Sequence, residues 1–277
     1  MSSLLVTGGT GTLGHGIVER LLQKSAYRSI RLLSRNEHTQ NAMRRKFDDS
    51  RLRFVIADVR DDEALRHAMR GCVHVIHAAA LKDVYTAKNN PMEVYKTNIK
   101  GSANIVRAAR DNGVERCVLV STDKAFEPVN LYGTTKKVAE SFFLSANEHR
   151  LPSDPLYSVT RYGNVWKSAG SVVPIWREQL SQGVRPIVRD PACTRFFMLL
   201  SEAVDLVLGT LAQMPKEVAI PILPAYDLGT LVKAMDIRGW IRGTLDEQTE
   251  KLHESLGPGL CSKSARRMSE AELRSHL

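Results

Sequence analysis

Residues 7–14 read Thr-Gly-Gly-Thr-Gly-Thr-Leu-Gly, and this stretch decides the fold. It directly follows a short apolar run at residues 4–6 and precedes a pattern of apolar residues at helical spacing over residues 17–22. A glycine-rich turn between a buried strand and a helix is typical of α/β domains that bind dinucleotides. We therefore expect such a domain to begin with the first residues of the chain.

The glycines of this turn are spaced three apart and would serve different purposes. Gly8 allows a tight turn, Gly11 lets the backbone approach a pyrophosphate, and Gly14 lets the helix lie close to the strand. The first N–H groups of the helix would donate to the phosphates. A glycine-rich turn without a ligand is the alternative. The residues that we expect at the cofactor phosphates are Gly8, Thr10, Gly11, Thr12, Leu13 and Gly14.

Further short apolar runs alternate with helical patterns, and this alternation predicts a parallel sheet covered on both faces. The runs lie at residues 30–33, 54–57, 73–80, 117–121 and 156–161. A helix is expected from Pro91 to about Asn112, with Pro near its start and Gly113 just past its end. The predicted fold class is α/β, a Rossmann-type doubly wound parallel sheet with a small C-terminal substrate-binding part.

Ser34 and Arg35 lie about 20 residues beyond Gly14, at the end of the second predicted strand. An NAD-binding domain usually has Asp or Glu here, to accept a hydrogen bond from the ribose 2′-hydroxyl. A hydroxyl followed by Arg better suits a 2′-phosphate, because a guanidinium can pair with it in a fork. We predict NADP as cofactor, with NAD as the second choice and a solvent-facing Arg35 as the alternative. Asp58, after the third strand, either accepts from the adenine amino group or caps the following turn.

The pattern of the chain changes beyond Arg150. We expect a helix at 201–214 capped by Ser201, a last strand at 218–223, helical patterns at 227–236 and 244–256, and a short helix from Ser269. Residues 1–165 are assigned to an NADP-binding Rossmann domain, to which 196–225 return. Residues 166–195 and 226–277 are assigned to a small substrate-binding part.

Tyr132 and Lys136 form Tyr-x-x-x-Lys, which on a helix brings both side chains to one face. A free phenol has a pKa near 10 and is a poor base at neutral pH, but a nearby ammonium lowers that pKa. The lysine can also hold the nicotinamide ribose. A half-buried packing tyrosine is the alternative. The position after the fifth strand of a cofactor-binding sheet favours the chemical interpretation.

Thr122, Asp123 and Lys124 lie at the C-terminal end of the fifth predicted strand. Ligands of open parallel sheets bind at this edge. Thr122 can hydrogen-bond a sugar hydroxyl, and the two residues after it offer one acid and one potential base. A solvated ion pair in a loop is the alternative, but the nearness to Tyr132 argues against it.

The composition is that of an ordinary globular protein of 277 residues, with 43% hydrophobic and 25% charged residues. Its net charge of +9 suits an anionic ligand, whereas only 6% of residues are aromatic and the arginines are scattered, which argues against a nucleic-acid surface. The four cysteines lack metal-ligand spacing. No apolar run approaches the roughly 18 residues of a membrane span, and the first residues lack a signal-peptide pattern. We expect a cytoplasmic protein without a metal, a nucleic-acid partner or a membrane segment.

Many stretches together resemble the extended short-chain dehydrogenases/reductases, and specifically the inverting UDP-N-acetylglucosamine 4,6-dehydratases of polysaccharide biosynthesis. The matching stretches are TGGTGTLG, LLSRNE, ADVRD, HAAALK, NPMEVYKTNIKG, STDKAFEPVNLYGTTK, VTRYGNV, GSVVP and TRF, with EKLHE at 250–254. They cover most of residues 1 to about 200. Related retaining dehydratases carry Asp-Glu where this chain has Asp123-Lys124, so the lysine indicates the inverting branch.

The resemblance implies a UDP-sugar substrate and a reaction with defined residue roles. Tyr132, as phenolate, would remove the C4 hydroxyl proton while a hydride leaves C4. Lys124 would then act as base at C5, which requires its neutral form and hence a lowered pKa. Asp123 would protonate the C6 hydroxyl as it departs as water. The cofactor would be regenerated in each turnover and would stay bound.

The resemblance also implies contacts from residues that no motif above assigns. Along the cofactor we expect Val59, Ala78, Ala79, Ala80, Lys82 and Asn98, although Asn98 could instead fix the helix backbone. Along the sugar nucleotide we expect Lys82, Thr122, Asn164, Ser171, Val172 and Arg195. Arg195 would pair a diphosphate oxygen, with an ordinary surface salt bridge as the alternative. Relatives often form symmetric oligomers, so a homo-oligomer is expected.

Departures from the family pattern keep other reactions open. Ala169 replaces the usual arginine, Tyr85 stands where a non-aromatic residue is expected, and the chain is short after Glu254. A 4-epimerase would need Tyr132 but not the adjacent acid and base, and a 5,6-dehydratase of the same fold is a further alternative. An alternative of another class is a non-catalytic NADP-binding sensor or scaffold.

Overall fold

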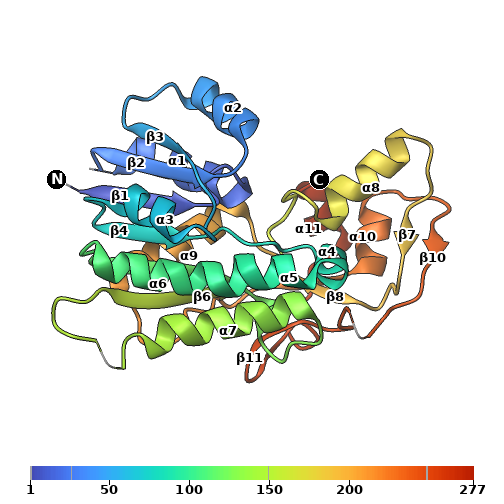
Figure 1. Cartoon of the computed structure of the whole chain (residues 1–277). Coiled ribbons are helices and arrows are strands. Elements are labelled where there is room, and N and C mark those ends of the chain that lie inside the picture. Colours follow the sequence, from blue (N-terminus) through green and yellow to red (C-terminus); the bar gives the residue numbers. More distant parts are fainter. Residues whose placement is uncertain (1, 26, 149, 248) are drawn as a thin grey trace.

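Six parallel strands form the central sheet of the computed structural model, in the order β3-β2-β1-β4-β5-β6 (Figure 1). The structure describes residues 2–25, 27–148, 150–247 and 249–277. The strands are β1 (Ser3–Thr7), β2 (Ser29–Ser34), β3 (Leu52–Ile56), β4 (His74–His77), β5 (Arg116–Thr122) and β6 (Leu156–Tyr162). All their pairings are parallel, so the predicted Rossmann-type sheet is confirmed.

Two hydrophobic cores lie on the opposite faces of this sheet. Successive side chains of a strand point to opposite faces, and in β1 Leu4 and Val6 join one core while Leu5 joins the other. The first core receives α1 (Thr12–Lys24), α2 (Glu37–Phe47) and α9 (Leu200–Gln213). The second receives α3 (Asp62–Met69), α6 (Gly101–Asp111) and α7 (Leu131–Ser145). Strands that are apolar throughout are therefore covered on both sides.

The predicted helix from Pro91 runs as three consecutive segments. They are α5 (Pro91–Val94), the π-helical turn η1 (Tyr95–Lys100) and α6, and they follow the short α4 (Val84–Asn89). Within the π-helical turn, Asn98 accepts from the Leu81 N–H at 2.9 Å and donates to the Leu81 carbonyl at 2.9 Å and to the Thr135 hydroxyl at 3.0 Å. This side chain fixes the segment after β4 against α7.

The C-terminal part has a hydrophobic core of its own, around Trp166, Trp176, Phe197 and Leu231. Figure 1 shows α8, α10 and α11 beside the carboxyl end of the sheet. Its elements are α8 (Val172–Ser181), β7 (Ile187–Val188), β8 (Thr194–Phe196), β9 (Ala225–Asp227), α10 (Leu228–Ala234), β10 (Ile241–Arg242), β11 (Ser255–Gly257), β12 (Leu260–Cys261) and α11 (Glu270–Ser275). In the described part of the chain, no helix has the length and apolar character of a membrane span.

Several local predictions for this part are confirmed and others are wrong. Ser269 caps α11, as predicted, and its hydroxyl accepts from the Glu272 N–H at 3.2 Å. Ser201 is not a cap, because α9 begins at Leu200 and the Glu202 carboxylate takes the Leu199 N–H at 2.7 Å. The predicted strand at 218–223 is reduced to one bridge, Ala219 to Thr160, since prolines interrupt its N–H groups.

The helix predicted at 244–256 is also wrong over the described residues 244–247 and 249–256; position 248 lies outside them. The segment has one turn, in which the Asp246 carbonyl accepts from the Glu250 N–H at 2.8 Å, and it continues into β11. Other backbone carbonyls of the segment are bound from outside, which removes bonds that a helix would need. Asn130 donates to the Thr249 carbonyl at 2.8 Å, and Arg195 donates to the Lys251 carbonyl at 3.1 Å.

Candidate active site

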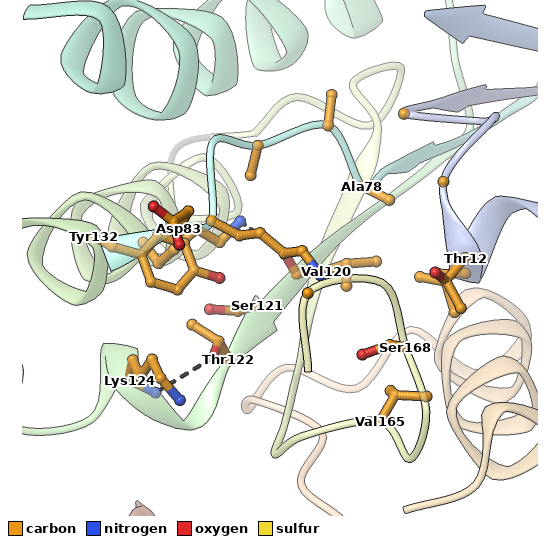
Figure 2. Close-up of a pocket in the computed structure, with 18 of the residues that line it drawn as sticks. Thr12, Ala78, Asp83, Val120, Ser121, Thr122, Lys124, Tyr132, Val165 and Ser168 are labelled. Atoms are coloured by element: carbon orange, nitrogen blue, oxygen red, sulfur yellow. Dashed lines mark hydrogen bonds between the residues drawn. The ribbon is translucent and has the colours of Figure 1, made fainter. Parts of the chain in front are cut away.

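A cavity of about 660 Å³ opens along the carboxyl ends of the central strands (Figure 2). The predicted site residues that line it are Gly8, Thr10, Gly11, Thr12, Leu13, Ser34, Arg35, Asp58, Val59, Ala78, Ala79, Ala80, Lys82, Thr122, Asp123, Lys124, Tyr132, Lys136, Asn164 and Ser171. The others, Gly14, Asn98, Val172 and Arg195, lie outside the lining found among the described residues. The edge of the sheet thus brings most of the residues predicted from the sequence together around one cavity.

The glycine-rich turn has the geometry of a phosphate cradle. Gly8 has a φ of +68°, and a Cβ there would lie 2.9 Å from the Ala78 carbonyl carbon. A Cβ at Gly14 would lie 2.1 Å from the Gly9 carbonyl oxygen, so this position lets α1 pack closely on the glycine-rich turn. Gly11 is the N-cap of α1 and has no side chain to occupy the N–H groups of the first turn. These residues fit the diphosphate of a dinucleotide.

The end of β2 presents a guanidinium at the rim of the cavity. Arg35 has a side chain that is 56% exposed, and its Nη1 lies 3.8 Å from Asp58 Oδ2. Asp58 accepts from the Arg60 backbone N–H at 2.9 Å and from the Arg60 guanidinium at 2.6 Å. Burial raises the pKa of Asp58, but the hydrogen bonds from Arg60 outweigh burial and lower it below its ordinary value. Asp58 therefore caps the turn, which is one of its two predicted roles, and its contact with the adenine amino group stays a prediction.

Tyr132 and Lys136 share the cavity face of α7, as predicted, but they are not paired with each other. Lys136 Nζ donates to the Val120 carbonyl at 2.7 Å. Burial lowers the pKa of Lys136 to about 8, although Glu140 acts to raise it. Burial also raises the pKa of Tyr132 to about 12, with Lys124 and the Thr122 hydroxyl acting in the opposite direction. The predicted lowering of the phenol pKa by Lys136 is thus wrong for the protein alone.

Thr122, Asp123 and Lys124 form the tight turn η2 (Asp123–Ala125) after β5. Thr122 Oγ1 accepts from the Lys124 backbone N–H at 3.4 Å and donates to Asp123 Oδ1 at 2.9 Å. Figure 2 shows Thr122 and Lys124 below the Tyr132 ring. Lys124 Nζ lies 3.2 Å from Asp123 Oδ1 and 3.3 Å from Glu254 Oε1. The turn therefore brings an acid and an amine to the phenol.

The charge state of Lys124 differs from the prediction. Burial acts to lower its pKa, but Asp123 and Glu254 outweigh burial and raise that pKa above its ordinary value. The neutral, low-pKa lysine predicted from the sequence is therefore wrong for the protein alone. Lys124 is a protonated amine held by two carboxylates, and its side chain is 21% exposed.

Arg195 does not take the position predicted for it. It is 6% exposed, and its guanidinium donates to the Thr194 carbonyl at 2.8 Å and to Glu250 Oε1 at 2.6 Å. A salt bridge is observed, but Arg195 is buried in it and not at the surface, as the alternative had it. Arg189 lines the cavity instead, with its guanidinium carbon 4.9 Å from the centre of the Tyr85 ring and a salt bridge to Glu250.

The comparison with known families is consistent with this geometry. Residues 4–258 match the family described as polysaccharide biosynthesis protein. The chain belongs to this family. It is 41% identical over 258 residues to a UDP-N-acetylglucosamine 4,6-dehydratase (inverting) of Campylobacter jejuni, an alignment that covers 92% of this chain and 77% of the relative. It is 37% identical over 262 residues to a UDP-glucose 4-epimerase of Rickettsia prowazekii, with the same shares covered.

Solved structures show how far the fold of this polysaccharide biosynthesis family member is shared. Pen from Bacillus thuringiensis superposes with a TM-score of 0.92 at 28% identity, over 99% of this chain and 96% of that one. The dTDP-glucose 4,6-dehydratase DesIV from Streptomyces venezuelae, solved with NAD bound, superposes with a TM-score of 0.82 at 21% identity, over 99% and 95%. The Rossmann-type architecture is therefore common to all of them.

Sequence reasoning missed several residues of the site in this family member, among them Glu254, Arg189 and Glu250. The latter two line the cavity. Glu250 begins and Glu254 ends the EKLHE stretch, which enters the sequence argument only through the family resemblance. Arg189 belongs to no motif, so its place follows only from the tertiary structure.

Proposed function

We propose that this chain catalyses the NADP-dependent, C5-inverting 4,6-dehydration of UDP-N-acetylglucosamine. The observation that carries the proposal is the meeting of Tyr132, Asp123 and Lys124 at the end of a cavity that begins with a phosphate cradle. A phenol, an acid and an amine are the groups that this reaction requires. The 41% identity to an inverting dehydratase of Campylobacter jejuni supports the same assignment.

The cofactor would lie along the glycine-rich turn. The first turn of α1 would hold its diphosphate, Arg35 would pair a 2′-phosphate, and Lys136 would hold the nicotinamide ribose. Arg35 is exposed at the end of β2, where a carboxylate would be expected for NAD. When bound, the nicotinamide supplies reversible hydride exchange with the sugar.

Proton transfer begins at the phenol. Tyr132 Oη accepts the C4 hydroxyl proton as phenolate, which must form against a pKa raised to about 12 by burial. The ammonium of Lys124 acts against that rise, so it assists the ionisation. The C4 ketone that results acidifies the proton at C5.

One proton then passes from Lys124 to Asp123, which makes Lys124 a base and Asp123 an acid. Passage of a proton from Lys124 Nζ to Asp123 Oδ1, over 3.2 Å, gives a neutral amine and a carboxylic acid together. Lys124 removes the C5 proton, and Asp123 gives its proton to the C6 hydroxyl, which leaves as water. The hydride taken from C4 would then return to C6, and a proton would add to C5 from the opposite face, which gives the inverted 4-keto-6-deoxy sugar. The raised pKa of Lys124 in the protein alone means that Lys124 is protonated before the reaction begins. The proton transfer to Asp123 is the step that makes Lys124 neutral.

One basic side chain at the cavity suits the diphosphate of a sugar nucleotide. Arg189 lines the cavity, whereas Arg195 is buried and bound to Glu250 and backbone carbonyls. We therefore assign the diphosphate contact to Arg189 and a structural role to Arg195.

A UDP-sugar 4-epimerase is the second candidate, because relatives with that name are 37% identical over 92% of this chain. An epimerase would use Tyr132 and Lys136 without need of Asp123 and Lys124. The two candidates differ in their products, so one experiment separates them.

The test is incubation of the protein with UDP-N-acetylglucosamine and NADP in deuterated water, followed by NMR of the product. We expect a 4-keto-6-deoxy sugar with deuterium at C5 and an inverted C5 centre. Lys124→Ala should abolish elimination, so the NMR spectrum of its reaction mixture should show only the starting sugar. A C4 epimer without loss of water would replace the dehydratase assignment by the epimerase. Full turnover by Lys124→Ala would remove the amine from its role.

A further inference from the structure

Glu254 is a buried carboxylate that the proton steps above do not use. It is 1% exposed. Ser262 fixes its backbone from two sides: the Ser262 N–H donates to the Glu254 carbonyl at 2.8 Å, and the Ser262 hydroxyl accepts from the Glu254 N–H at 2.9 Å. The hairpin of β11 and β12 follows at once, and β11 packs against η2. The carboxylate is therefore held rigidly beside the turn that bears Asp123 and Lys124.

One oxygen of this carboxylate contacts the catalytic amine and the other contacts nothing polar. Oε1 lies 3.3 Å from Lys124 Nζ. Oε2 is buried and has no hydrogen-bond partner among the described residues. A buried carboxylate oxygen without a partner costs free energy, so packing alone gives no reason for a charged side chain here. Glu254 interacts electrostatically with the Arg195 guanidinium as well, but its ion pair within 4 Å among the described residues is with the Lys124 amine, and this contact points to a role in the reaction.

We propose that Glu254 is a positioning residue of the acid–base pair, which holds the Lys124 ammonium at the cavity and keeps a negative charge beside it while Asp123 changes its protonation. The role rests on the proposed dehydratase function. It extends that function to a residue far along the chain from the Asp-Lys motif.

The charge balance of the steps explains the need for a second carboxylate. When a proton passes from Lys124 to Asp123, both groups become neutral and Glu254 is the charge that remains. When Lys124 then takes the C5 proton, the new ammonium forms beside Glu254. Asp123 is still protonated until it gives its proton to the C6 hydroxyl, which departs as water. Glu254 keeps its own charge throughout and forms no covalent bond.

The groups that face Lys124 come from several elements. They are Asp123 on η2, Tyr132 on α7, Arg195 on β8, Tyr226 on β9, Lys82 after β4, and Glu254 before β11. Burial and Arg195 lower the pKa of Lys124, while Asp123, Glu254 and Tyr132 raise it. Loss of one carboxylate should therefore make the ammonium easier to deprotonate.

A titration without substrate tests this directly. The protein is labelled with ¹³C at the lysine ε-carbon, the Lys124 signal is assigned by its loss in Lys124→Arg, and its shift is followed against pH. We expect the midpoint in Glu254→Gln to lie at least about one pH unit below that of the unchanged chain. Equal midpoints in folded proteins would overturn the proposal. Because no substrate is present, this result stands apart from any failure of the dehydratase assignment.

Activity gives the second readout. Glu254→Gln should lower kcat about 10- to 100-fold with KM within about threefold, and move the pH optimum toward acid. Glu254→Asp retains the charge, so its kcat should be at least about tenfold higher than that of Glu254→Gln. An equal loss of kcat in both variants would contradict the proposal. Glu202→Gln, at the N-terminus of α9 and outside the cavity lining, is the matched control and should behave like the unchanged chain.

Discussion

Replacement of Gly133 by alanine would test how closely α7 must lie against the catalytic turn. A Cβ at Gly133 would stand 2.1 Å from the Lys124 carbonyl oxygen and 3.1 Å from Pro128 Cβ, whereas ordinary contacts begin at 3.4 Å. Relief of the overlap requires the first turn of α7 and the turn at Lys124 to separate by roughly 1 Å. Tyr132 and Lys124 sit on the two sides of that contact, so the phenol and the amine would move apart.

A misplacement of about 1 Å costs on the order of 100-fold in rate, and overpacking costs about 1–3 kcal/mol in the free energy of unfolding. We therefore expect Gly133→Ala to lose about 100-fold in kcat/KM and about 1–3 kcal/mol of stability, measured by product formation and urea unfolding. Gly209→Ala is the matched control in α9, since apart from the neighbouring backbone of its own helix no heavy atom of the described residues lies within 4 Å of a Cβ placed there. It should gain about 0.5–1 kcal/mol with unchanged activity. If Gly133→Ala behaves like Gly209→Ala in both assays, the close approach has no functional meaning.

Three further predictions concern the cofactor, the substrate and the pH. Arg35→Asp should weaken binding of NADP at least about tenfold and that of NAD less, by fluorescence titration; equal losses would show that Arg35 does not contact a 2′-phosphate. Arg189→Ala should raise KM for UDP-N-acetylglucosamine about tenfold with little change in stability. Arg195→Ala should lower the free energy of unfolding in urea by about 3–5 kcal/mol, because it leaves Glu250 without its buried partner. The opposite pattern would reverse the two assignments. Burial lowers the pKa of Lys136 from 10.5 to about 8, so the folded protein holds this proton less tightly than the unfolded chain does. The free energy of unfolding should therefore rise between about pH 8 and 10.5 relative to that of Lys136→Met. Parallel curves of stability against pH would contradict this.

The parts of the fold that depend on local pattern could be predicted from the sequence. The glycine-rich turn and the strand ends at Ser34, Asp58 and Thr122 follow from short-range rules, because apolar runs and turns determine them locally. The segment at 244–256 could not be predicted, since side chains from distant parts of the chain bind its carbonyls.

The chemistry of the site divides in the same way. The sequence places Tyr132 and Lys124 at one sheet edge, and the structure brings them together. It cannot give the charge state of Lys124, which depends on Glu254, a residue far along the chain. The predicted diphosphate contact failed for a similar reason, because Glu250 lies between Arg189 and Arg195 and binds the buried one tightly.

The π-helical turn at Tyr95–Lys100 has a consequence for how this chain can change. Such a turn holds one residue more than an ordinary α-helical turn. Deletion of a single residue there would restore a regular helix with little rotation of Pro91–Val94 relative to α6, but it would remove the widened turn from which Asn98 reaches its partners. Asn98 would then leave Leu81 and Thr135, and the wall of the cavity after β4 would lose its anchor. Length changes should therefore be selected against at this turn far more strongly than substitutions on its exposed side.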